Sequence, residues 1–139
     1  RPVPRLGARR LAGMSYLFDT NIVIYYFNGL TADDALHQLL AESFKISMIT
    51  KIEFLGWSVF ASDPRLYSQA RAFIGHAQVF DLSAEIVEQT IRLRQQFKTK
   101  PPDALIAATA LVNDPTVITH NTSDFMRLGL DTRTVTMKP

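Results

Sequence analysis

The stretch "SYLFD", residues 15–19, is a short apolar run that ends on an acid. Such a run predicts a strand buried inside the protein. Similar runs predict three more strands, "KISMI" at 45–49, "QVFDL" at 78–82 and "TVIT" at 116–119, and an edge strand, "TVTM" at 134–137. The sequence therefore predicts a sheet whose strands are mostly separated by long stretches of sequence.

Helical patterns fill those intervals, over residues 21–27, 31–43, 50–61, 63–74, 83–98, 103–113 and 123–128. Thr31 is the expected N-cap of the second helix, and Thr50 with Glu53 matches a capping box at the start of the third. Strands that alternate with helices favour a parallel sheet with helices on both faces. We predict an α/β fold of three layers, α/β/α, around a central, mostly parallel sheet of four to five strands.

The composition suits one folded domain. The chain has 139 residues, of which 47% are hydrophobic and 20% charged, the balance of a soluble globular protein. The absence of cysteine excludes disulfides, thiolate metal sites and cysteine nucleophiles, and is compatible with a reducing cytoplasm. The longest apolar runs are far shorter than the roughly 20 residues that a membrane helix needs. We predict a cytoplasmic protein without a membrane span.

Residues 1–13, "RPVPRLGARRLAG", contain four arginines and no acid. We interpret them as an extension, either a tag or a mis-annotated start, with a basic arm that contacts RNA or a partner as the alternative. The predicted domain is 14–139. Without the four arginines, 11 basic and 13 acidic residues remain, so a positive groove requires local clustering.

Three acids follow predicted strands, and a fourth opens a buried helix. Asp19 closes the first strand, Glu53 lies one turn beyond the second, Asp124 follows the fourth, and Asp103 opens the buried helix of "KPPDALIAATALVND", residues 100–114. Strand-to-helix turns of a parallel sheet meet at its carboxyl edge, where such folds bind ligands. Each acid alone is also explained as a helix cap or a first-turn charge. Together they predict one acidic site.

Carboxylates gathered at one edge repel one another, and two unit charges about 4 Å apart interact by about 4 kcal/mol at an effective dielectric of 20. A divalent ion would relieve this repulsion. An oxygen-only ligand set favours Mg²⁺ or Mn²⁺ over Zn²⁺. The expected chemistry is metal-assisted phosphodiester hydrolysis. Of the histidines, His120 is expected beside the site, while His37 and His76 are expected to be structural or exposed.

These motifs resemble the PIN-domain ribonucleases, in particular the VapC-type toxins of toxin–antitoxin pairs. The resemblance runs from about residue 15 to 138 and rests on "FDTN" (18–21), Glu53 in "TKIEFLGW", "PPDALIAATAL" (101–111) and "THNTSDF" (119–125). It implies a PIN fold and a metal-dependent endoribonuclease that cleaves structured RNA such as tRNA. Its acidic core would be Asp19, Glu53 and Asp103.

The resemblance also suggests further site residues. A fourth, often acidic, family position falls on Asn121, with Asp124 three residues later; either completes the catalytic set, and Asp124 is the candidate metal ligand. The neutral Asn121 leaves open whether one or two ions bind. Residues expected to orient the acids are Thr20, Asn21 and Thr119.

The family resemblance implies a homodimer and a cognate antitoxin that lays a helix over the site. The aromatic residues Tyr25, Tyr26, Phe27, Phe54, Trp57 and Phe60 offer a surface for that helix, with ordinary core packing as the alternative. Candidates for contacts with RNA phosphates are Arg92, Arg94, Lys98 and Lys100. A solvated helix face explains these basic residues equally well.

Two other functions stay open. A catalytically weakened PIN fold would bind RNA or protein without cleavage, and the neutral Asn121 keeps that reading open. An Asp-phosphoacceptor signalling domain would also gather acids at a sheet edge. It would want an acidic pair near the first strand and a lysine after the last, whereas this chain has a lone Asp19 there.

Overall fold

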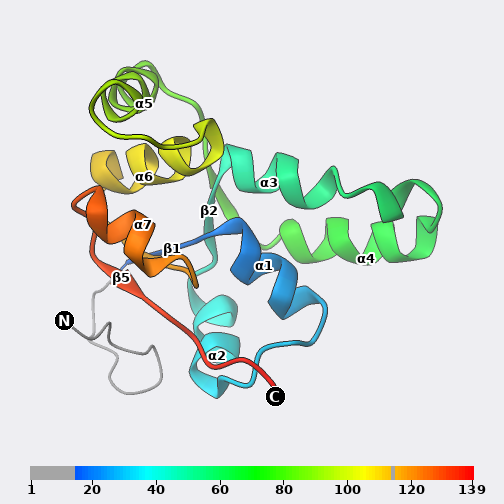
Figure 1. Cartoon of the computed structure of the whole chain (residues 1–139). Helices are drawn as coiled ribbons and strands as arrows, with labels where there is room; N and C mark the ends of the chain where they lie inside the picture. Colours follow the sequence, from blue (N-terminus) through cyan, green and yellow to red (C-terminus); the bar gives the residue numbers. More distant parts are fainter. Residues whose placement is uncertain (1–14, 114) are drawn as a thin grey trace.

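The computed structural model describes residues 15–113 and 115–139, so the predicted extension at 1–13 lies outside the described residues. In chain order the elements are β1 (Tyr16–Phe18), α1 (Thr20–Phe27), α2 (Asp34–Glu42), β2 (Lys45–Ser47), α3 (Met48–Leu55), η2 (Ser58–Ala61), α4 (Pro64–Ile74), β3 (Gln78–Phe80), α5 (Ala84–Gln96), α6 (Pro101–Asn113), β4 (Thr116–Ile118), α7 (Thr122–Arg127) and β5 (Thr132–Arg133) (Figure 1). Strands and helices alternate as predicted.

The strands form two hydrogen-bonded groups that lie side by side. β4 pairs with β1 on one side and with β5 on the other, and β2 pairs with β3; every one of these pairs is parallel. β1 also contacts β2, and Lys45 Nζ donates to Ser15 Oγ at 2.8 Å across that junction. The predicted mostly parallel sheet is confirmed, with β1 and β4 at its centre.

Side chains of β1 show that helices cover both faces. Tyr16 and Phe18 pack into a core with residues of α1, α2 and α4, whereas Leu17 points the other way, into a core with residues of α5, α6 and α7. All three side chains are at most 2% exposed. Figure 1 shows the two helical groups on opposite sides of the strands. The predicted three layers are confirmed.

Helix α6 is buried along most of its length. Small side chains let it lie close to its neighbours: Ala104, Ala107 and Ala108 are fully buried, and Ile106 is 1% exposed. Burying one such isoleucine stabilises the fold by about 1.5–3 kcal/mol. The helix is therefore a rigid support for whatever its first turn carries.

Two predicted boundaries are wrong because of local capping. The helix expected over 50–61 is divided into α3 and η2, since Gly56 ends α3 and a Cβ there would lie 2.7 Å from the Ile52 carbonyl oxygen. The N-cap of α3 is Ser47, whose side chain accepts from the Ile49 N–H, so the capping box at Thr50 does not form. Thr50 and Glu53 are free for other contacts.

Two further predictions need correction. Helix α2 is capped by Asp33, whose side chain accepts from the Ala35 N–H, and Thr31 instead forms an isolated bridge with Met137. The fifth strand lies at Thr132–Arg133, ahead of the "TVTM" segment that was expected to form it. In both cases the pattern is right and the position is shifted by two residues.

The aromatic residues divide between core and surface. Phe54 and Phe60 are 0% and 5% exposed, and each packs edge-to-face against Phe27, so the core alternative holds for them. Trp57, on the arm formed by α3, η2 and α4, remains 40% exposed.

Among the described residues, no helix is long and apolar enough to cross a membrane.

Candidate active site

Asp19 lies where the central strand β1 meets α1. Its backbone N–H donates to the Ile118 carbonyl and so continues the pairing of β1 with β4. Its side chain is held at both oxygens: Oδ1 accepts from the Thr20 N–H and Oδ2 from the Thr119 hydroxyl, each at 2.7 Å. Thr119 directly follows β4, so adjacent parallel strands deliver the acid and its donor to one edge.

The environment of Asp19 opposes its charge. Burial raises the pKa of this carboxyl, hydrogen bonds from Thr119 and Thr20 lower it, and the negative charges of Asp103 and Glu53 raise it again, to a pKa of about 6. Only 4% of the residue is exposed. Asp19 therefore lies within the electrostatic reach of both other predicted core acids.

Asp103 stands half-buried in the first turn of α6. Burial raises the pKa of its carboxyl, the charges of Asp124 and Glu53 raise it further, and the Lys100 ammonium lowers it. The four acids predicted from the sequence thus share one electrostatic environment, although they come from four separate parts of the chain.

Glu53 is exposed on α3, one helical turn after the buried Thr50. Its Oε1 accepts from the Thr20 hydroxyl at 2.8 Å, and that hydroxyl lies 3.0 Å from Thr50 Oγ1. Thr20 therefore joins two acids, through its backbone to Asp19 and through its side chain to Glu53. The predicted supporting role of Thr20 has a geometric basis.

Residues after β4 support the site unequally. The Asn121 N–H donates to Thr119 Oγ1 at 2.8 Å, and Thr119 in turn donates to Asp19. Asp124 is exposed in the first turn of α7 and acts on Asp103 through its charge. His120 instead hydrogen-bonds Thr134 and packs against the Tyr25 ring. A water-exposed position suits Asp124 as a ligand bound through water.

One predicted supporting residue makes no contact that would show its role, and another supporting residue was missed. Asn21 is exposed and makes no side-chain hydrogen bond within the described part of the chain, so its orienting role stays a prediction. Thr50 is fully buried and contacts Thr20, although the sequence suggested only a helix cap. The signal for Thr50 was its position one helical turn before Glu53.

Among the described residues, no side-chain cation neutralises these acids by direct pairing. Within residues 15–113 and 115–139 none of the four forms a salt bridge, and the Lys100 charge acts on Asp103 without pairing with it. No three acidic or histidine side chains in that part of the chain enclose a metal position by themselves. Mg²⁺ usually binds through one or two carboxylates and keeps several waters, so the oxygen-only set fits such an ion.

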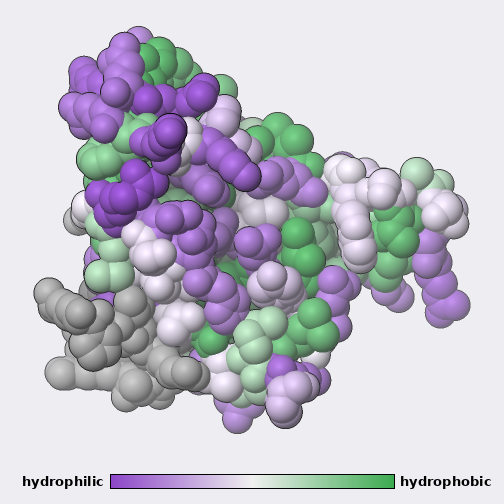
Figure 2. Space-filling model, viewed as in Figure 1, coloured by the Kyte–Doolittle hydropathy of each residue, from purple (hydrophilic) through white to green (hydrophobic). Residues whose placement is uncertain are grey.

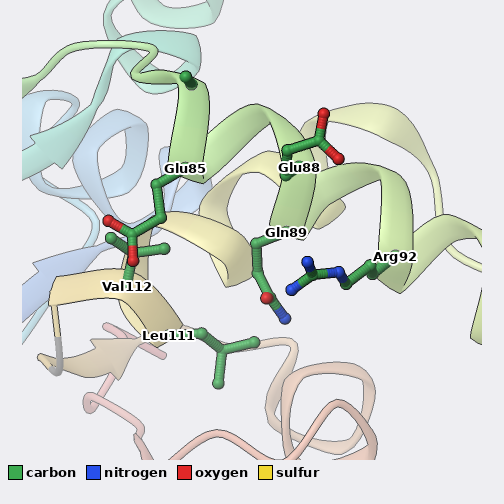
Figure 3. Close-up of a pocket in the computed structure, with 7 residues that line it drawn as sticks. Glu85, Glu88, Gln89, Arg92, Leu111 and Val112 are labelled. Atoms are coloured by element: carbon green, nitrogen blue, oxygen red, sulfur yellow. The ribbon is translucent and has the colours of Figure 1, made fainter.

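The predicted RNA-binding residues are all exposed, but they face different surroundings. Arg92 lines a pocket of about 630 Å³ on α5 and α6 together with Glu85 and Glu88, and its side chain points toward Gln89 (Figure 3). Lys100 acts through its charge on Asp103. Arg92 is therefore the weakest of the four candidates for contact with phosphates.

A basic residue not foreseen from the sequence fixes the segment beside the site. Arg127 of α7 donates from Nη2 to the Lys98 carbonyl at 3.0 Å, and its guanidinium lies 5.9 Å from the centre of the Phe97 ring. This contact ties α7 to the segment that precedes α6. Figure 2 shows hydrophilic residues over α5 and across the middle of the face of the molecule that is turned to the viewer in Figure 1.

Fold and site together define a class: a three-layer parallel α/β protein with an acidic, oxygen-only site at the carboxyl edge of its sheet. A family model for the PIN domain matches residues 16–129. The chain belongs to the PIN domain family, as its motifs predicted.

Solved structures agree with this assignment. A toxin–antitoxin complex from Klebsiella pneumoniae contains a chain 37% identical to this one, with a TM-score of 0.65 over 80% of this chain and 90% of that one. VapBC2 from Rickettsia felis, bound to a DNA fragment from its promoter, is 26% identical, with a TM-score of 0.74 over 87% and 98%. DNA-bound VapBC from Salmonella typhimurium, 22% identical with a TM-score of 0.75 over 87% and 98%, shares the fold. A comparison with curated proteins gives no match.

Proposed function

We propose that this protein is a metal-dependent endoribonuclease, a VapC-type toxin that hydrolyses phosphodiester bonds in RNA. The observation that carries the proposal is the buried Asp19, which lies in the field of Glu53 and Asp103 without a salt bridge in the described chain. Such a site favours a divalent cation. Membership of the PIN family and the similarity to toxin–antitoxin complexes support the same reading.

The proposed ion is Mg²⁺ or Mn²⁺. Asp19, Asp103 and Glu53 would hold it, and Asp124 would bind it through water. A bound ion of this kind lowers the pKa of a water and neutralises charge on a phosphoryl group. The chain contributes the geometry. Two hydrogen bonds fix Asp19, Thr20 orients Glu53, and the buried helix α6 fixes Asp103.

RNA would reach the site across the segment that contains Lys98 and Lys100. Positive side chains there contact phosphates without reading sequence. Lys100 is best placed for this role because its charge already acts on Asp103. We propose structured RNA such as tRNA as the substrate class, and the cytoplasm as the place of the reaction.

The proposed partner is a cognate antitoxin, as in the neighbouring toxin–antitoxin complexes. A pocket of about 460 Å³ on α1, α2 and α4 is partly aromatic and includes Tyr26, Phe44 and Phe73. An amphipathic antitoxin helix would place its apolar face there. The functional unit would be a homodimer.

The test is incubation of the purified protein with a mixed tRNA pool and Mg²⁺ or Mn²⁺, with and without a chelator. Cleavage that the chelator stops and that added Mn²⁺ restores supports the nuclease. Cleavage that persists unchanged in the chelator contradicts metal dependence, and an Asp103→Asn variant shows whether the cutting comes from this site.

A catalytically weakened binding module is the second candidate. It is favoured by the lack of three converging acid side chains in the described residues and by the neutral Asn121. This reading predicts tRNA retention on the protein, seen as a shifted band in a native gel, without fragments in either metal. Fragments under those conditions exclude it.

A further inference from the structure

Thr50, in the first turn of α3, differs from Thr90 and Thr109, which lie in the interiors of α5 and α6. A helical threonine commonly returns its hydroxyl to the carbonyl four residues before it. Thr90 and Thr109 do so, with distances of 2.7 and 2.8 Å. Thr50, 0% exposed on α3, instead lies 3.0 Å from Thr20 Oγ1 on α1. Its hydroxyl joins two elements that carry site acids.

The chemistry of the three groups fixes the direction of this contact. The Thr20 hydroxyl donates to Glu53 Oε1 at 2.8 Å. A threonine has one hydroxyl hydrogen, so Thr20 must accept in its contact with Thr50. Thr50 has no other side-chain partner within the described chain, and its hydrogen therefore points to Thr20.

We propose that Thr50 is a positioning residue, the first donor of a hydroxyl relay from Thr50 through Thr20 to Glu53. The relay holds the exposed Glu53 carboxylate toward Asp19 and Asp103, whose negative charges would otherwise turn it to solvent. The inference rests on the proposed metal-dependent activity. Losing a supporting hydrogen bond of this kind weakens metal binding or activity by about 10–100-fold.

The experiment compares Mn²⁺ affinity, by isothermal titration calorimetry, with tRNA cleavage rates. The variants are Thr50→Val, which keeps the shape and removes the donor, Thr50→Ser, which keeps the donor, Thr20→Val, and the double variant Thr20→Val/Thr50→Val. Thr109→Val is the matched control, since Thr109 is also buried in a helix but its hydroxyl donates to the Leu105 carbonyl of the same helix. Thermal melting shows that each variant is folded.

The relay predicts a loss of about 10-fold in both measurements for Thr50→Val, with Thr50→Ser and Thr109→Val within about twofold of wild type. It also predicts that Thr50→Val adds nothing once Thr20 is valine, because the two residues act as one path. A purely structural Thr50 would give additive losses and no rescue by serine.

The two proposals fail in different ways. Wild-type protein that binds Mn²⁺ but cuts no RNA contradicts the nuclease, while the affinities of the variants still decide the relay. Wild-type cleavage with a fully active, tightly binding Thr50→Val variant overturns the relay alone. Wild-type protein that binds no Mn²⁺ overturns the relay too, because Glu53 would then have no ion to be held toward.

Discussion

Two regions of this molecule gather carboxylates, and they do so differently. In the pocket on α5 and α6, Glu85 and Glu88 are exposed to water, and Arg92 lines the same pocket. At the carboxyl edge of the sheet, Asp19 is buried beside Glu53 and Asp103, and hydroxyl and backbone donors take the place of a cation. Carboxylates become a candidate metal site when burial and mutual repulsion act on them together.

The largest expected effect is on cleavage. Asp19→Asn or Asp103→Asn removes a charge that the proposed ion requires, and the loss of several kcal/mol of transition-state stabilisation lowers the rate by on the order of 100-fold or more. Glu88→Gln, in the contrasting pocket, is the control and should leave the rate unchanged. A time course on a tRNA pool in Mn²⁺ checks this. A folded Asp103→Asn variant with wild-type rate would remove that residue from the site.

The pH dependence of stability gives the next largest effect. In metal-free protein the pKa of Asp19 is about 6 when folded and 3.8 as an ordinary aspartate, so the folded state binds the proton more tightly. The free energy of unfolding therefore falls as pH rises from about 4 to above 6, by about 3 kcal/mol. Urea titrations at a series of pH values, in chelator, measure it.

Asp19→Asn is the control for that pH series, because its side chain does not titrate. The difference in unfolding free energy between wild type and variant should change across this window in favour of the variant. A difference that is the same at pH 4 and pH 7 would show that Asp19 is not buried against its neighbours' charges.

A smaller effect is expected from Thr119→Val. The substitution removes the hydroxyl that donates to Asp19 Oδ2 and leaves the Asn121 N–H without its acceptor. Loss of a supporting hydrogen bond predicts cleavage reduced by about 10-fold. Thr119→Ser should recover most of the rate. Equal losses in the serine and valine variants would point to packing of the methyl group instead of the hydroxyl.

The smallest effect is expected from Asp124→Asn. Asp124 is exposed and acts on Asp103 through its charge, which solvent screens. We expect a rate about threefold lower, with a Mn²⁺ affinity that also falls slightly, because a water-bridged ligand contributes less than a direct one. A loss as large as that of Asp103→Asn would make Asp124 a direct ligand.

The fold could be predicted from the sequence because its strands are continuous apolar runs and its helices are strongly periodic. Positions decided by single side-chain contacts were missed. Asp33 competes with Thr31 for the cap of α2, and Ser47 competes with Thr50 for the cap of α3. The residue whose side chain accepts from a nearby backbone N–H group becomes the helix cap. A hydrophobic pattern does not show these hydrogen bonds.

That the four acids lie near one another could be predicted, because strand ends and the start of one helix bring them to one edge. The threonine network could not, since Thr20, Thr50 and Thr119 come from three elements whose spacing only the folded chain sets. Basic residues were the least predictable. Arg92 lies within one helical pattern and Lys100 just after it, yet Arg92 lines a pocket on α5 and α6 while Lys100 acts through its charge on Asp103.

The claim that the acids repel one another until a divalent ion binds has a direct test in thermal unfolding. Wild-type protein stripped of metal is melted at pH 7.5 with chelator or with Mn²⁺, beside Asp19→Asn and Asp103→Asn. The account predicts that Mn²⁺ raises the melting temperature of wild type alone, while in chelator Asp19→Asn melts higher than wild type. Equal shifts in all three proteins, or no shift in wild type, would contradict it.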